Sequence, residues 1–205
     1  MYGVLIGFEL VLCPKAMLDW RMRKLSAQGL CMLNLRDFQM RDMPHLLQAI
    51  VDEKMLMQFA GPAYVFPLTA EQVAVDLHAD DVRVFSMVTA ADEVVGHAQM
   101  QVLSDSVLLR RILIWDESWR GQGWGQHMVR QLLEVAFAMP KVKQVRLNVF
   151  AWNTPAIRCY QRLGFVMSVE SAKTVSVAGE TWQSVGLLIL LNHRLTDTQR
   201  FGVIF

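Results

Sequence analysis

The glycine-rich loop at residues 119–125, Trp-Arg-Gly-Gln-Gly-Trp-Gly, constrains this chain more than any other stretch. It follows an apolar, strand-like run (108–115) and precedes a helix-like run (126–139). Glycine adopts positive φ values and lets another group approach the backbone closely. At the start of a helix, such a loop directs N–H groups and the positive end of the helix dipole toward one point. The loop therefore predicts a site for a phosphate or another anion. The alternative is a tight strand-to-helix turn that needs small residues for packing.

Length and composition limit the classes of function. The chain has 205 residues, which is enough for one domain with a substantial core. Its formal net charge of +1 gives no reason to expect nucleic acid or an anionic membrane as a partner. No apolar run reaches the roughly 20 residues that span a bilayer. The three cysteines lie far apart and the five histidines lack metal-ligand spacing, so we expect no disulfide framework, no metal and a reducing cytoplasm as the location.

The first 30 residues differ from the rest of the chain. They hold a short apolar run with Glu9 inside it and then a basic patch, but they lack the basic start and cleavage site of a signal peptide. We expect residues 1–30 to form an extension and residues 31–205 to form a single domain. Met32 is a candidate for the true translation start.

Hydrophobic periodicity predicts the order of elements β-α-α-β-β-β-α-β-α-β-β. A strand at 31–38 precedes a helix that Asp42 caps and that buries a stripe ending in Ile50 and Val51, and a loop leads to a capping box at Thr69. The remaining predicted segments are a hairpin at 82–89 and 94–103, a strand at 107–115, a helix at 126–139, a strand at 145–150, a helix from Asn153 to Gly164, and strands at 165–177 and 182–191. The strand, glycine loop, helix and next strand form a βαβ unit with parallel strands. The fold class is therefore α/β (α+β), a mixed sheet with helices on both faces.

The loop does not match the common phosphate-binding motifs. A dinucleotide fingerprint needs a third glycine where Gln126 or Met128 stands, and a P-loop needs a lysine after the glycines. The G-x-S-x-G elbow of hydrolases is absent from the sequence as well.

The stretch Arg120-Gly-Gln-Gly-Trp-Gly125 instead resembles the acetyl-coenzyme A motif of the GNAT (Gcn5-related) N-acetyltransferases, written Q/R-x-x-G-x-G/A. A second block is similar to the family's N-x-x-A-x-x-x-Y-x-x-x-G-F segment, with its five positions at Asn153, Ala156, Tyr160, Gly164 and Phe165. The resemblance covers about residues 33–191. It implies the GNAT fold, acetyl-CoA as co-substrate and an amine as acceptor.

The resemblance also implies roles for particular residues. Tyr160 is the candidate general acid toward the coenzyme A sulfur, whereas periodicity alone favours a buried core aromatic at this position. The pantetheine arm is expected to pair with backbone groups near Leu113 and Trp115, in a gap between two splayed strands. The residues expected to contact the rest of the cofactor are Arg120, Gly121, Gln122, Gly123, Trp124, Gly125 and Asn153. Arg120 could instead be a solvated loop residue, and packing of the loop against the sheet is the better interpretation of Trp119 and Trp124.

The chain departs from the family pattern near the loop. Trp115 and Glu117 stand where the family often has a small aliphatic residue and a proline. No general base is evident, because the strand offers Arg110 and Arg111 where many relatives place a glutamate. His97 is a weak candidate base, with an ordinary, partly exposed histidine as the alternative.

The sequence thus predicts an acyltransferase that moves an acetyl group from acetyl-CoA to a primary amine on a small molecule or peptide. The alternatives are a non-catalytic acyl-CoA-binding module and a generic anion-binding domain. The sequence does not choose among protein N-termini, lysines, polyamines, amino acids and antibiotics as acceptors. A homodimer is left open by the family resemblance.

Overall fold

A computed structural model describes residues 33–115 and 119–191 of the chain. The predictions for residues 1–30, Met32, Asp116 and Glu117 lie outside these ranges. No helix in the two described ranges is long and apolar enough to cross a membrane.

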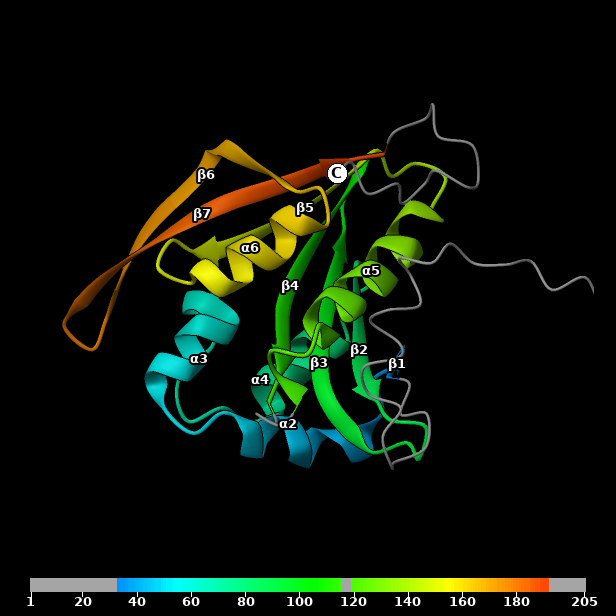
Figure 1. Ribbon diagram of the computed structural model, residues 1–205. Helices are drawn as coiled ribbons and strands as arrows, with labels where there is room; N and C mark the ends of the chain where they lie inside the picture. The colour runs from blue at the N-terminus through cyan, green and yellow to red at the C-terminus, as the bar shows by residue number, and fades with distance from the viewer. Residues whose placement is uncertain (1–32, 116–118, 192–205) are drawn as a thin grey trace, which may run out of the picture. The chain divides into compact units, whose positions relative to one another are not determined.

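A seven-stranded mixed sheet forms the centre of the described domain, with the strand order β1-β2-β3-β4-β5-β7-β6 (Figure 1). The strands are β1 (Asn34–Asp37), β2 (Val82–Val88), β3 (Val94–Val102), β4 (Ser106–Ile114), β5 (Gln144–Phe150), β6 (Val166–Val177) and β7 (Glu180–Leu190). All neighbouring strands run antiparallel except β4 and β5, which are parallel as predicted for the βαβ unit. The predicted class, a mixed sheet with flanking helices, is confirmed.

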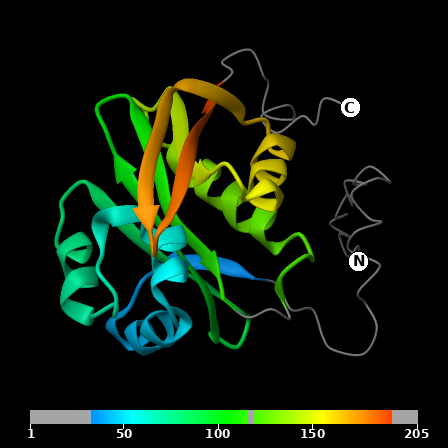
Figure 2. The same cartoon turned by 90° about the vertical axis from the view of Figure 1, so that its left-hand side faces the viewer.

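Helices cover both faces of this sheet, and each group has its own apolar core (Figures 1 and 2). The helices are α2 (Met43–Ala49), α3 (Glu53–Ala60), α4 (Ala70–Leu77), α5 (Trp124–Phe137) and α6 (Thr154–Arg162), with short 3-10 turns η1 (Met40–Asp42) and η2 (Gly61–Ala63). Helix α5 buries Met128, Val129, Leu132 and Leu133 against one face. Helices α2, α3 and α4 form a second cluster that includes Leu46, Leu56 and Val73.

One helix was missing from the predicted order. The backbone becomes extended at Ile50 (φ −100°, ψ 97°), and the Asp52 side chain then caps α3 by accepting a hydrogen bond from the Met55 amide. Val51 follows in the extended segment and is no longer part of the helix, so its side chain is 68% exposed. The predicted buried stripe therefore ends at Ile50. The Asp52-Glu53 pair is an ordinary N-terminal helix signal that the sequence contained.

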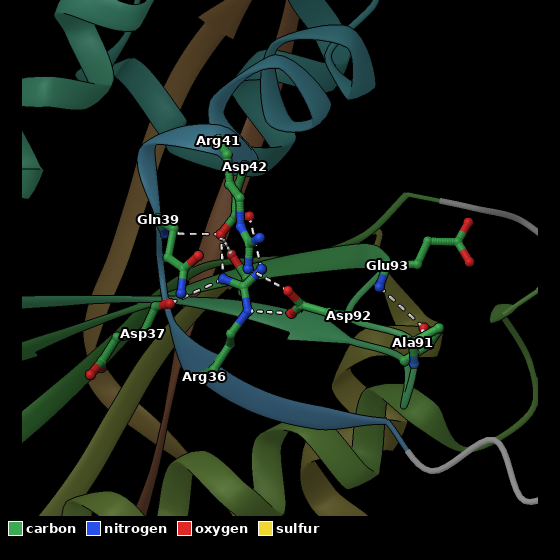
Figure 3. A network of polar contacts seen from close by, with 10 residues as sticks. Arg36, Asp37, Gln39, Arg41, Asp42, Ala91, Asp92 and Glu93 are labelled. Atoms are coloured by element: carbon green, nitrogen blue, oxygen red, sulfur yellow. Dashed lines mark hydrogen bonds and ion pairs between the residues drawn. The ribbon is translucent and has the colours of Figure 1, made fainter.

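Asp42 is the N-cap residue of α2, as predicted, but its side chain makes no capping bond to this helix. Its carboxylate accepts two hydrogen bonds from Arg36 (2.6 and 2.9 Å), one from the Ser86 hydroxyl (2.6 Å) and one from the Gln39 amide (2.9 Å). Figure 3 shows Arg36 between Asp42 and the exposed Asp92, which also pairs with Arg41. The bond from the Gln39 amide is part of a local capping box at η1, and the ion pairs tie β1, η1 and the turn after β2 together.

Candidate active site

The centre of the sheet opens between β4 and β5. Their parallel pairing covers only Ser106–Leu109 against Gln144–Leu147, although β4 continues to Ile114 and β5 to Phe150. Beyond Leu109 the two strands diverge, so backbone groups of β4 on that side have no strand partner in β5. Such an edge can hydrogen-bond an extended ligand in the manner of an added strand.

A β-bulge at Arg111 contributes to the shape of this opening. Arg111 has a φ of 53°, and the register with β3 changes from Gln99 opposite Arg110 to His97 opposite Leu113. Two steps on β3 therefore match three on β4, which defines a bulge. The extra residue reverses the side-chain alternation of β4: Leu109 lies in the α5 core, whereas Leu113 packs against the cluster formed by α2, α3 and α4.

The glycine loop lies directly before α5, as predicted. Gly121 (φ 69°) and Gly123 (φ 88°) adopt the left-handed region, and a Cβ atom at either position would meet nothing within 4 Å. Gly123 is the N-cap of α5, whose first-turn N–H groups have no acceptor within the helix. The open space, the unpaired helix start and the helix dipole suit an anionic group such as a diphosphate.

Arg120 folds back onto the end of β4. Its Nε donates to the Ile114 carbonyl at 3.0 Å and its Nη2 to the Trp115 carbonyl at 3.1 Å. The guanidinium thus braces the loop, a role that the sequence did not indicate. Trp119 and Trp124 pack edge-to-face with ring centroids 6.0 Å apart, next to the α5 core, in agreement with the packing interpretation of both residues.

The two predicted backbone positions on β4, Leu113 and Trp115, lie two residues apart and so point to the same side of the strand. The Trp115 amide donates to the Val95 carbonyl of β3 at 3.3 Å, so this N–H points away from β5. Because neighbouring residues in a strand point their backbone groups to opposite sides, Ile114 faces the opening. The Leu113 carbonyl oxygen lies 2.7 Å from where a Cβ on Gly96 would stand, so only glycine fits at position 96 without movement.

Helix α6 brings the second sequence block to the glycine loop. Asn153 is its N-cap, and its side-chain oxygen accepts from the Ala156 amide at 3.2 Å. A Cβ on Gly125 would lie 3.9 Å from the sulfur of Cys159, which precedes Tyr160. The structure therefore brings together the glycine loop, the start of α5 and the middle of α6.

Tyr160 is partly buried and packs edge-to-face on Phe165, with ring centroids 5.9 Å apart. Burial raises the pKa of its phenol well above the usual value, and the neighbouring Cys159 adds to this. The phenol is therefore protonated at neutral pH, which a general acid requires, although the raised pKa makes it a weaker proton donor than an ordinary tyrosine.

The bulge places both arginines of β4 on one side, where they meet Asp76 of α4. Arg110 donates to Asp76 Oδ1, and Arg111 donates to Asp76 Oδ2 at 2.6 Å. The hydroxyl of Tyr64 donates to the same Oδ2, and its ring lies 4.1 Å under the guanidinium of Arg111. We call this group, together with His97 and Gln99, the bulge cluster. Sequence reasoning missed Asp76, although two adjacent arginines in an apolar strand signal a need for a buried acidic partner.

His97 is 1% exposed, so the expectation of a partly exposed histidine is wrong. Its ring packs against Phe38 and Phe59, with centroids 5.6 and 5.7 Å away. Burial lowers its pKa to about 3, and the charge of Arg111 acts in the same direction. The imidazole is therefore neutral at physiological pH and does not have the properties of an effective base. Among the described residues, no group of histidine, cysteine and acidic side chains could hold a metal ion.

A sheet that opens between two parallel strands, beside a glycine loop at a helix start, defines a fold suited to an extended ligand with an anionic group. The model of the acetyltransferase (GNAT) family matches residues 50–165, which is more than half of the chain. The chain belongs to this family, and the family prediction is confirmed.

Known proteins agree with this assignment. A stretch of 64 residues is 39% identical to the spermine/spermidine N(1)-acetyltransferase of Bacillus subtilis (strain 168), covering 31% of this chain and 41% of that protein. The match thus spans about two fifths of the curated relative. The fold is similar to that of the spermidine N-acetyltransferase from Vibrio cholerae, solved in complex with CoA and spermine (TM-score 0.66, 19% identity, 77% of this chain and 95% of that chain). An aminoglycoside acetyltransferase solved with coenzyme A is also similar (TM-score 0.60, 20% identity, 78% and 95%).

Proposed function

We propose that the protein transfers an acetyl group from acetyl-CoA to a primary amine, by direct attack within a ternary complex. The observation that carries this proposal is the opening between β4 and β5 directly beside the glycine loop. Family membership and the amine-acetylating relatives support it.

The residues that would hold the co-substrate fall into three groups. The glycine loop and the start of α5, from Arg120 to Gly125, would receive the diphosphate on backbone N–H groups. The edge of β4 near Leu113 and Trp115 would receive the pantetheine arm through the backbone of Ile114, which lies between them and faces the opening. Asn153 would make its contact through the amide nitrogen, since its oxygen is used in capping α6.

Acetyl-CoA supplies the acetyl group as an activated thioester. The acceptor amine must arrive neutral, so that its nitrogen can form a bond to the acetyl carbon as the carbon–sulfur bond breaks. The Tyr160 hydroxyl would donate its proton to the departing sulfur, and the amine would lose a proton to water. Holding both substrates together can provide much of the rate, with the general acid adding about 10²–10⁴-fold.

The first test is release of free coenzyme A from acetyl-CoA in the presence of a panel of primary amines. We expect release that depends on the amine. Tyr160→Phe keeps the ring on Phe165 and removes only the hydroxyl, so kcat is expected to fall about a hundredfold with little change in thermal stability. An unchanged kcat and pH profile would remove the acid role from Tyr160.

The second candidate is a non-catalytic acyl-CoA-binding module. This candidate is favoured because Arg110 and Arg111 stand where many relatives place a catalytic glutamate, and both arginines are bound to Asp76. Calorimetric binding of acetyl-CoA without coenzyme A release on any amine would support it. A generic anion-binding domain predicts no stabilisation by acetyl-CoA, whereas a binder at a hundred times its Kd gains about 2.7 kcal/mol.

We further propose that residues 31–205 form one transferase domain, that residues 1–30 are an extension, and that the protein acts in the cytoplasm, with a homodimer left open. Mass spectrometry of the native N-terminus tests the extension, and light scattering of the purified protein tests the oligomeric state.

A further inference from the structure

The bulge cluster holds more positive than negative charge. Arg110 and Arg111 face the single carboxylate of Asp76. The other two titratable members are neutral at pH 7: burial and the bond to Asp76 raise the pKa of Tyr64 to about 12, and burial lowers that of His97 to about 3. Gln101, which accepts from Arg110 at 3.3 Å, binds the exposed Asp81 through its amide nitrogen. Two guanidinium charges thus share a single carboxylate, and the cluster carries an excess of positive charge.

The hydrogen bonds from Arg111 through Gln99 to His97 run in one direction. Arg111 donates to the side-chain oxygen of Gln99, so the amide nitrogen of Gln99 faces Nε2 of His97, at 3.3 Å. Since that nitrogen is a donor, Nε2 accepts, and the neutral ring carries its proton on Nδ1. The three buried cluster atoms without a hydrogen-bond partner in the described structure are His97 Nδ1, Arg110 Nε and Arg111 Nε. All three are N–H donors, so the group lacks an acceptor.

The cluster lies next to the opening in the sheet. The pairing of β4 with β5 stops at Leu109, immediately before Arg110, and His97 lies opposite Leu113. The side chains of Arg110 and Asp76 keep 25% and 11% of their surface exposed, so the cluster reaches solvent at one edge. An oxygen-bearing anion could approach the arginines there.

Within residues 33–115 and 119–191, the buried part of this site holds no carboxylate free to bind the second ammonium group of a polyamine. The two carboxylates buried in the described part of the chain, Asp42 and Asp76, are already paired with arginines. A carboxylate on the substrate amine would accept hydrogen bonds from the unpaired N–H groups of the cluster. Further ammonium groups on the substrate would instead be repelled by the arginines.

We infer that the acceptor is an amine that also carries a carboxylate, such as an amino acid, and that the bulge cluster binds that carboxylate through Arg110 and Arg111. This inference rests on the proposed transferase function. Planar guanidinium groups match carboxylates in geometry and charge, and such charged hydrogen bonds are stronger than bonds between neutral groups.

The test compares acceptors that differ only in the carboxylate: L-phenylalanine with 2-phenylethylamine, and L-leucine with 3-methylbutylamine, with spermidine as a fifth acceptor. We expect kcat/KM to be at least about tenfold higher for the amino acid of each pair. Arg110→Gln, at the partly exposed edge of the cluster, should abolish this preference by raising KM for the amino acid, and Arg110→Lys should retain part of it. Arg83→Gln, which removes an exposed arginine on β2, is the matched control and should leave the preference unchanged.

Equal or better use of spermidine or of the amines without a carboxylate would overturn the inference, and the proposed transferase function would stand. If no amine releases coenzyme A, the transferase proposal fails, and calorimetry decides the inference separately. Binding of phenylalanine, but not of phenylethylamine, to the CoA-saturated protein would support a carboxylate site, and binding of neither would refute it.

Discussion

Asp42 and Asp76 are both buried and both held by arginine, but their surroundings differ in one respect. At Asp42 every strong donor that points inward has found an acceptor, and Arg36 bridges to Asp92 on the outside. At Asp76 the two arginines and His97 keep buried N–H groups without partners. A saturated ion-pair cluster fixes structure, whereas an unsaturated one next to an opening has room for a ligand.

The largest expected effect is at the saturated cluster. Asp42→Asn leaves the mostly buried guanidinium of Arg36 without its main partner, so we expect a loss of about 3 kcal/mol in the free energy of unfolding. Urea denaturation measures it. Asp37→Asn, which removes an exposed partner of Arg83 from β1, is the control and should change stability by less than about 1 kcal/mol. Similar losses in both variants would contradict the assigned importance of Asp42.

The pH dependence of the free energy of unfolding should report the ionisation of the Asp42 carboxylate. Burial alone would raise the pKa of Asp42, but the bonds from Arg36, Ser86 and the Gln39 amide lower it from 3.8 to about 2. A lowered folded-state pKa adds stability above the unfolded value and loses it as pH falls, here between about pH 4 and 2. The contribution is about 2 kcal/mol. Urea titrations of wild type and Asp42→Asn should converge over this range, and parallel curves would refute the assignment.

The bulge beside the unsaturated cluster can be tested at Gly96. A methyl group there would lie 2.7 Å from the Leu113 carbonyl oxygen and 3.2 Å from Met87 Cβ, so β4 must shift. We expect Gly96→Ala to cost about 1–2 kcal/mol in stability and to weaken acetyl-CoA binding measured by calorimetry. Gly125→Ala is the control for stability, because its nearest contact at 3.9 Å is ordinary and alanine suits a helix. Full stability of Gly96→Ala would mean that β4 is less fixed at the bulge than described.

The smallest effect is expected at the exposed ion pair between Arg41 and Asp92, which lies outside the buried pair of Asp42 and Arg36. Arg41 is 63% exposed and pairs with Asp92, itself 43% exposed. Arg41→Ala should therefore change the free energy of unfolding by less than about 0.5 kcal/mol. A loss comparable to that of Asp42→Asn would show that the two shells of the cluster act as one unit.

Features that depend on neighbouring residues could be predicted from the sequence, whereas features that depend on distant residues could not. The glycine loop, the βαβ unit and the caps at Thr69 and Asn153 depend on residues close together in the chain, and their signals were legible. The bond between Asp76 and Arg111 joins residues 35 positions apart, and the bulge at Arg111 is a non-glycine residue with positive φ. The adjacent arginines signal that an acidic partner is needed but not which residue it is, and the bulge leaves no local signature. Asp42 shows the converse, since a correct local signal was overridden by tertiary partners.

The short pairing between β4 and β5 also sets how the sheet should respond to its co-substrate. Four residue pairs join the strands β1–β4 to the strands β5–β7, and beyond them the Ile114 amide faces the opening. In the free protein this amide should exchange its hydrogen for deuterium faster than that of Leu109, which lies within the paired segment. A pantetheine arm in the opening would act as a missing eighth strand, slowing that exchange and coupling the two halves of the sheet into one unfolding unit.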